Sequence, residues 1–194
     1  MRMPIVRGQP GFTLVELMVT LAVATVLVVI AVPSFVDFLD KVRLKGVAHN
    51  VVDLINDART ESVKQGRAIN VRFVGTSAAW CVGANAAAEP TNLGDTVPDA
   101  TPCDCTSSNA CIVGGAEKIF PTTLDNGVTV SETLPLSFKF DSRLGTVDSF
   151  GTTTVTLSSP RKRFDLQLTV TPLGQVSLCV PNTSKLPVSE YSSC

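Results

Sequence analysis

The sequence predicts an α+β protein in which one long N-terminal helix packs on a C-terminal antiparallel β-sheet or sandwich. Two observations carry this prediction. Residues 12–65 hold an apolar run followed by an amphipathic helical pattern, and the rest of the chain holds several runs that alternate apolar and polar side chains. A long helix followed by runs of strands is typical of α+β folds, because the helix must bury its apolar face on the sheet.

The first element is an apolar segment with the length of a membrane-spanning helix. Residues 17–36 contain no charged side chain, and about 20 residues at ~1.5 Å each cross a hydrocarbon core of ~30 Å. Arg2 and Arg7 precede the segment, and residues 1–15 contain no acid. The positive-inside tendency therefore places the N-terminus in the cytoplasm. No secretory cleavage site follows the apolar run, whereas Gly11 stands in front of it.

One carboxylate, Glu16, lies at the start of this segment. Thr13 precedes it by three positions, which is the spacing of a capping box, and an acid in the first turn suits the helix dipole. A carboxylate costs ~2.5–3.5 kcal/mol at mid-bilayer and less near the interface, so we expect a cationic partner. Cleavage after Gly11 would create such a partner, an amine at Phe12, on the same chain or on a neighbouring subunit.

The stretch GFTLVELMVTLAV resembles the class III signal of type IV pilins and pseudopilins. The match comprises Gly11, Phe12, Glu16 and the unbroken apolar run. The resemblance implies that a prepilin peptidase cleaves between Gly11 and Phe12 and methylates the new N-terminus. It also implies that Glu16 guides docking by engaging the N-terminal amine of a neighbouring subunit. Pro33 matches a helix-kinking proline of the family.

Pro33 by itself removes one helical hydrogen bond, so the helix should bend there or end. The helical pattern continues over residues 38–65, with Gly66 placed to terminate it. We therefore expect one long helix to about Gln65, half membrane-embedded and half amphipathic. Its apolar stripe consists of Val47, Val51, Leu54, Ile55 and Ala58.

Seven later runs have the alternation of half-buried strands, and turn residues such as Asn126-Gly127 separate some of them. The run ending at Val170 should turn one apolar face inward. Residues 84–115 are expected to form a long loop pinned by cysteines. The runs are residues 68–74, 78–83, 126–132, 136–141, 152–159, 163–170 and 175–180.

The six cysteines all lie in the C-terminal two thirds of the chain. An even number after a membrane segment suggests disulfides in an oxidising compartment. Zinc binding is the alternative. The spacing C-x-C-x5-C matches no common zinc site, and the only histidine, His49, is far upstream, so we expect no metal.

The pairing of the cysteines stays partly open. Cys194 ends the sequence, and its nearest candidate is Cys179. We expect Cys81 to pair with Cys105 or Cys111. A bond between Cys103 and Cys105 is too close for relaxed geometry.

The strand INVRF, the motif WCVG and the closing LTVTPLGQVSLC resemble the FimT/FimU/GspH group of minor pilins and pseudopilins. The cysteines favour the pilus members over the secretion pseudopilin GspH, because extracellular exposure rewards disulfides. Some FimT proteins bind DNA through a G-R-x-R motif. The matching place here, residues 174–177, reads Gly-Gln-Val-Ser, and the missing arginines argue against DNA binding.

A basic cluster at Arg161, Lys162 and Arg163, with Lys185 expected at the same end, is the second place where DNA could bind. The net charge of −1 and the lack of an aromatic stacking platform favour a solvated turn beside a strand edge. Catalytic motifs such as G-x-S-x-G, H-E-x-x-H and the P-loop are absent from the sequence. We therefore expect no enzymatic activity and no cofactor.

The residues and the resemblance together predict a pilin-like fold and a FimT/FimU-like minor pilin with a structural role in pilus assembly, priming or the tip. The alternatives are a GspH-like type II secretion pseudopilin and a DNA-binding minor pilin. Expected partners are other major and minor pilins, prepilin peptidase and the bacterial inner membrane. The expected parts are a cleaved leader (1–11), a transmembrane and filament-core helix (12–36), an amphipathic helix (37–66) and a disulfide-bearing periplasmic or extracellular domain (67–194).

Overall fold

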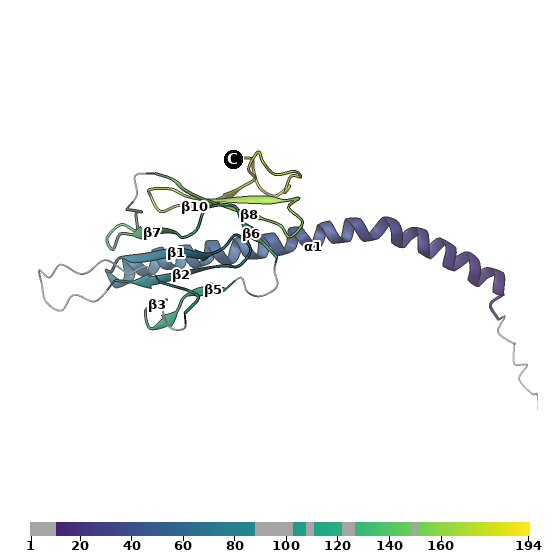
Figure 1. The fold of residues 1–194 in the computed structure, drawn as a ribbon, viewed down its shortest axis with the longest axis horizontal. Helices are drawn as coiled ribbons and strands as arrows, with labels where there is room; N and C mark the ends of the chain where they lie inside the picture. Colours follow the sequence, from purple (N-terminus) through teal and green to yellow (C-terminus); the bar gives the residue numbers. More distant parts are fainter. Residues whose placement is uncertain (1–10, 88–102, 108–110, 122–126, 149–150) are drawn as a thin grey trace, which may run out of the picture. The chain divides into compact units, whose positions relative to one another are not determined.

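The computed structural model describes residues 11–87, 103–107, 111–121, 127–148 and 151–194. The chain forms two compact units, one up to Leu39 and one from Asp40 to Cys194, and each is described by itself. Figure 1 shows the elements in chain order. They are α1 (Leu14–Gln65), β1 (Ile69–Gly75), β2 (Trp80–Ala86), β3 (Ile112–Val113), β4 (Ala116–Glu117), β5 (Ile119–Pro121), β6 (Thr129–Val130), β7 (Leu136–Phe140), β8 (Thr153–Ser158), β9 (Asp165–Val170) and β10 (Val176–Cys179).

The first unit is the N-terminal part of α1. Its large apolar side chains are exposed from Phe12 to Phe38. The hydroxyls of Thr20 and Thr25 donate to carbonyls one turn back, at 2.9 and 2.8 Å. Their hydrogen bonds are therefore satisfied within the helix, without water. The helix continues through Pro33 and does not end there. Among the described residues, α1 is long and apolar enough to cross a membrane.

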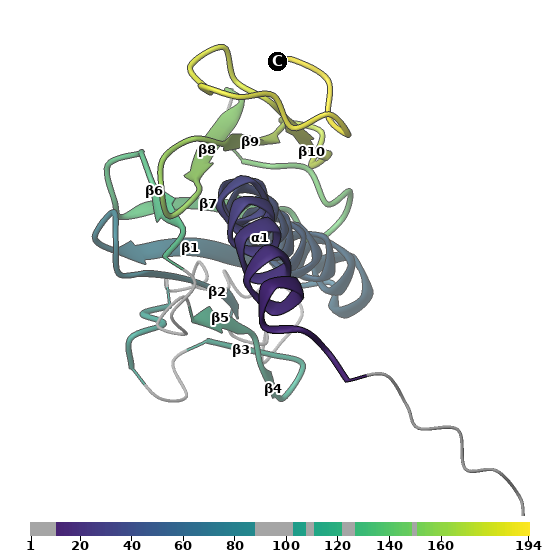
Figure 2. The same ribbon diagram turned by 90° about the vertical axis from the view of Figure 1, so that its right-hand side faces the viewer.

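The second unit begins with the amphipathic part of α1. The predicted stripe is confirmed, since Val47, Val51, Ile55 and Ala58 are buried and Leu54 packs partly buried against the same core. Figure 2 shows the sheet of β1, β2, β5 and β7 and the sheet of β8 to β10 beside this helix. The two sheets supply the apolar surface that the helical stripe requires.

Gly66 ends the helix as expected. Its φ is 60°, its N–H donates to the carbonyl of Val63 at 3.4 Å, and the N–H of Arg67 donates to that of Ser62 at 3.1 Å. These two bonds form a Schellman motif, in which a left-handed residue satisfies the last helical carbonyls. Glycine adopts that conformation without a Cβ penalty, so the chain turns directly into β1.

Two four-stranded antiparallel sheets enclose the core. Their orders are β5-β2-β1-β7 and β10-β9-β8-β6, and β3 pairs with β4 as a separate two-stranded sheet. In β1 the register places Phe73 opposite Val82 and Leu136. The predicted inward face of β9 is confirmed. Phe164, Leu166, Leu168 and Val170 are all buried.

The predicted fold class is confirmed, but some boundaries were wrong. Residues 84–86 extend β2, and residues 112–113 form β3, so the long loop expected over 84–115 is interrupted by strands. Gly114 and Gly115, with φ of 61° and 79°, form the turn between β3 and β4. Of the expected strand 126–132, only the two residues of β6 pair; Asn126 itself lies outside the described residues.

Candidate functional site

The proposed processing point lies just before α1. Gly11, Phe12 and Thr13 are exposed and not helical. A Cβ built on Gly11 would meet no atom within 4 Å, and the Phe12 side chain is 79% exposed. The Gly11–Phe12 bond therefore lies in an accessible, non-helical segment.

Thr13 and Glu16 form the N-terminal cap of α1. The Glu16 N–H donates to Thr13 Oγ1 at 3.2 Å, and the Leu17 N–H donates to the Thr13 carbonyl at 3.1 Å. The backbone of Glu16 is therefore part of a cap, as the spacing predicts. Within the described residues, no side chain pairs with its carboxylate.

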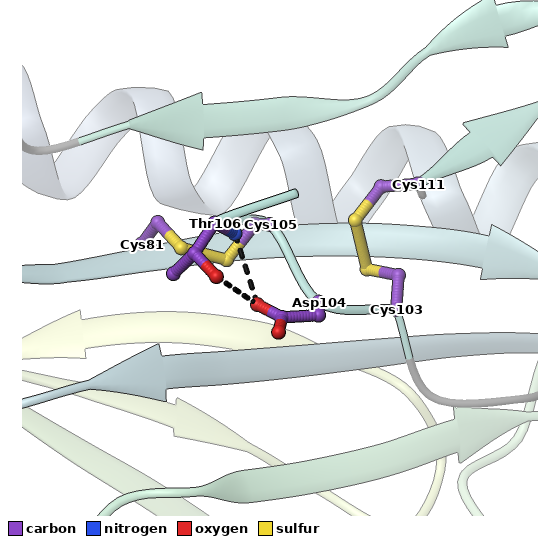
Figure 3. Close-up of a disulfide and its surroundings, with 6 residues drawn as sticks. All are labelled: Cys81, Cys103, Asp104, Cys105, Thr106 and Cys111. Atoms are coloured by element: carbon purple, nitrogen blue, oxygen red, sulfur yellow. Dashed lines mark hydrogen bonds between the residues drawn. A yellow bond between two sulfur atoms is a disulfide. The ribbon is translucent and has the colours of Figure 1, made fainter. Parts of the chain in front are cut away.

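Two disulfides lie side by side over β2 (Figure 3). Cys81 is bonded to Cys105 and Cys103 to Cys111, with Cα atoms 6.0 and 5.0 Å apart. Both sulfurs of the second bond contact β2 at Gly83, where a side chain would collide with them. The sequence left open whether Cys81 pairs with Cys105 or Cys111, and here it pairs with Cys105.

Asp104 lies between these disulfides and stabilises the turn that carries them. Its Oδ1 accepts bonds from the hydroxyl and the N–H of Thr106, at 2.6 and 3.0 Å. These bonds to the charged form hold the pKa of Asp104 below its ordinary value.

The third disulfide joins Cys179 to Cys194 and fastens the C-terminal segment to β10. The Cys194 N–H also donates to the carbonyl of Val180 at 3.0 Å. Two side-chain contacts link this segment to α1. Lys45 forms an ion pair with Glu190 at 2.6 Å, and His49 shares a hydrogen bond with Tyr191 at 2.8 Å. The sole histidine is thus a helix-face residue hydrogen-bonded to tyrosine, and burial raises the pKa of that tyrosine.

The basic cluster occupies the tight turn between β8 and β9. Ser159 shapes this turn, because its carbonyl accepts the Lys162 N–H at 2.8 Å and its hydroxyl accepts the N–H groups of Arg163 and Phe164. Lys162 has a φ of 50° and is exposed. Arg161 Nη1 lies 3.5 Å from the buried carboxylate of Asp40. Sequence reasoning missed this partner, because no local pattern links residues 40 and 161.

The place that matches the G-R-x-R motif is the turn between β9 and β10. Gly174 has a φ of 75°, and its N–H donates to the carbonyl of Thr171 at 2.8 Å. The nearest arginine is Arg59 of α1, whose Nη2 donates to the carbonyl of Leu173 at 3.0 Å. That arginine is used to hold the turn on the helix.

The described residues show no cluster of three His, Cys, Asp or Glu side chains able to hold a metal ion. An open groove of about 450 Å³ lies between α1 and β4–β5. Asp57 and Lys118 form an ion pair of 2.5 Å in it. Lys118 therefore balances the charge of Asp57, and Asp53 and Glu117 are further acids that line the groove.

Comparison with known proteins gives one family match and one structural likeness. Residues 6–32 match the prokaryotic N-terminal methylation motif. The crystal structure of the type IV minor pilin FimU from Pseudomonas aeruginosa is similar with a TM-score of 0.47 and 16% sequence identity, over 78% of this chain and 97% of the FimU chain. No curated protein matches the chain significantly in sequence.

The methylation motif spans residues 6–32, which include Gly11, Phe12, the cap of α1 and most of the apolar segment. It stands at the start of an exposed apolar helix suited to membrane anchoring, and that helix continues into a domain of antiparallel sheets. In this N-terminal segment the chain is type IV pilin-like.

Proposed function

We propose that the chain is a minor pilin of the FimT/FimU type, a structural subunit of a type IV pilus or of its priming or tip complex. The observation that carries this proposal is the combination of Gly11-Phe12 and Glu16 within the methylation motif, directly ahead of an exposed apolar helix. A plain membrane anchor would require the helix but neither the cleavage point nor the acid.

In this proposal prepilin peptidase removes residues 1–11 and methylates Phe12. The carboxylate of Glu16 then binds the N-terminal amine of a neighbouring pilin, which neutralises both charges in the apolar interior of the filament. Residues 12–36 pack against the helices of other pilins. Pro33 gives this part of the helix a point where it can bend, since one backbone donor is missing.

The membrane orientation follows from charge and redox chemistry. Arg2 and Arg7 favour a cytoplasmic N-terminus in the bacterial inner membrane. Three disulfides in the domain beyond α1 support its location in the oxidising periplasm and, after assembly, in the extracellular filament. The same disulfides favour a pilus over the secretion pseudopilus. Deletion of the gene, scored for twitching, secretion and DNA uptake, separates these roles.

The test of processing is the intact mass of the protein recovered from membranes of a strain with active prepilin peptidase. We expect a mass that begins at methylated Phe12 and gains six alkyl groups only after reduction, as three disulfides require. A mass that still begins at Met1 would refute the pilin proposal and leave a plain membrane anchor.

The test of docking is the substitution Glu16→Gln, with Glu16→Asp as the control that keeps the charge. We expect Glu16→Gln to be processed normally but to be lost from sheared filaments, because the amine of the neighbour has no countercharge. The Glu16→Asp protein should still be found in sheared filaments, in a smaller amount than the wild type. Equal incorporation of all three proteins would exclude the proposed ion pair.

A further inference from the structure

We propose that a basic collar at the start of the folded domain binds anionic phospholipid headgroups of the membrane in which the apolar segment is anchored. The inference rests on membrane anchoring of α1, as the proposed function does, but not on assembly into a filament. The collar consists of Lys41, Arg43, Arg161, Lys162, Arg163 and Lys185.

The turn between β8 and β9 lies against the first residues of α1 that belong to the folded domain. Arg161 lies 3.5 Å from the carboxylate of Asp40, and Lys41 Nζ lies 4.8 Å from the centre of the buried Phe164 ring. These contacts bring residues that are some 120 positions apart to the same turn of the helix. The turn is therefore held beside the first helical residues of the folded domain.

The C-terminal segment is hydrogen-bonded to the same turn and to the start of β9. The Leu186 N–H donates to the carbonyl of Arg163, and the Asp165 N–H donates to Ser184 Oγ, both at 3.0 Å. Residues 184–186 thus run beside the basic turn. Lys185, between them, is exposed, so three separate parts of the chain contribute positive charge to one end of the domain.

The collar lies close to the end of the apolar segment. The last residue of the uncharged run is Val36, and α1 is helical from there to Asp40. Four residues of helix rise only ~6 Å. The headgroup layer on each side of the hydrocarbon core is itself several Å thick. The connection along the chain therefore keeps the start of the collar within a few residues of the headgroup layer when the apolar segment is in the membrane.

The local charge is positive although the chain as a whole has a net charge of −1. The acids nearby are Asp37 and Asp40 on α1 and Asp165 on β9, against the six basic residues of the collar. A surplus of three positive charges remains. Basic residues beside a membrane segment attract anionic lipids over about a Debye length.

The aromatic side chains favour lipid over nucleic acid as the partner. Phe164, the aromatic ring inside the collar, is buried and cannot stack on a base. Phe35 and Phe38, close in sequence to Lys41, are exposed. Exposed apolar side chains next to basic ones suit the boundary between acyl chains and headgroups.

The test variant is Lys162→Asn with Lys185→Gln. Asparagine tolerates the left-handed backbone at position 162, so the turn should be kept. Arg161 is left in place because it pairs with buried Asp40. The control variant, Lys64→Gln with Arg143→Gln, removes two exposed basic side chains far from the membrane. Lys64 lies 28 residues beyond Val36, which is ~42 Å of helix.

The measurement is native mass spectrometry of the full chain in nonionic detergent with equimolar phosphatidylglycerol and phosphatidylcholine. We expect the wild-type chain and the control variant to retain phosphatidylglycerol roughly threefold over phosphatidylcholine. The collar variant should lose this preference. No preference in the wild type, or an equal loss in both variants, would overturn the proposal.

Duplex DNA added to the same three proteins, with binding read by fluorescence anisotropy, tests the other partner. Binding of DNA that only the collar variant loses, without any lipid preference, would make the collar a nucleic-acid surface and the lipid proposal wrong. The two proposals fail separately. If the chain still starts at Met1, the pilin proposal is wrong, but the lipid preference can still be measured. If the chain is processed and shows no lipid preference, only the lipid proposal is wrong.

Discussion

Arg161 Nη1 lies 3.5 Å from Oδ2 of Asp40, a residue that is only 3% exposed. The contact joins the turn between β8 and β9 to the first helical turn of the folded domain. A carboxylate removed from water needs a countercharge or donors to remain ionised at low cost. Arg161 supplies the charge while its own side chain remains half exposed.

Arg161→Ala should lower the free energy of unfolding by about 1–2 kcal/mol, because it leaves the buried carboxylate without its countercharge. The sole tryptophan, Trp80, is 2% exposed, so its fluorescence reports urea unfolding of the full chain in nonionic detergent. Adding Asp40→Asn to Arg161→Ala should recover part of the loss. A double variant no more stable than Arg161→Ala would show that the buried charge is not the cause.

Arg59 holds two distant loops on α1. Its Nε donates to the carbonyl of Gly145 and its Nη2 to that of Leu173, both at 3.0 Å. Arg59→Met keeps the apolar stem but removes both donors, so we expect a loss of about 1.5–3 kcal/mol in the same urea titration. Arg59→Lys keeps one donor and the charge and should lose less. Equal stability of Arg59→Met and the wild type would contradict this role.

Gly83 has no room for a side chain. A Cβ there would lie 2.5 Å from Cys111 Sγ and 2.8 Å from Cys103 Sγ. Gly83→Ala should therefore destabilise the domain by about 1–3 kcal/mol, since the disulfide must shift. Gly46→Ala is the matched control. Its Cβ meets nothing within 4 Å on the exposed face of α1, so alanine should stabilise the helix by up to about 1 kcal/mol. The prediction is wrong if both changes have the same sign.

Asp141 gives the domain an acid-sensitive contact. Its Oδ2 accepts the N–H groups of Arg143 and Leu144, at 2.9 and 3.2 Å, which lowers the pKa of the carboxyl from its ordinary value of 3.8. The folded state binds this proton less tightly than the unfolded state. The stabilisation is therefore present above the unfolded pKa and is lost as the pH falls through the folded pKa.

Asp141→Asn retains an acceptor oxygen but does not titrate. From pH ~5 to ~2.5 the wild type should lose more stability than the variant, by at most about 1 kcal/mol, because solvent screens this largely exposed group. Urea titrations at several pH values, followed by Trp80 fluorescence, measure the difference. Parallel pH dependences of the two proteins would count against the contact.

The elements that the sequence predicts correctly are those encoded by nearby residues. The stripe from Val47 to Ala58 repeats with the period of a helix, and Gly66 follows it where a left-handed residue is needed. The alternation from Phe164 to Val170 likewise specifies one buried face of β9. The pair β3–β4 and the short extent of β6 were harder to predict, because two-residue strands are too short to show a period. The Gly114-Gly115 dipeptide was the one local signal for that pair.

By itself the sequence determined the apolar helix, the methylation motif with Gly11, Phe12 and Glu16, and the α+β class, since each depends on residue order within a few turns or strands. Only the tertiary structure decided that Cys81 pairs with Cys105, and that Arg161 meets Asp40. These contacts join residues far apart in the chain. The packing of the sheets and the helix determines which residues meet, and the local spacing of residues in the sequence does not indicate it.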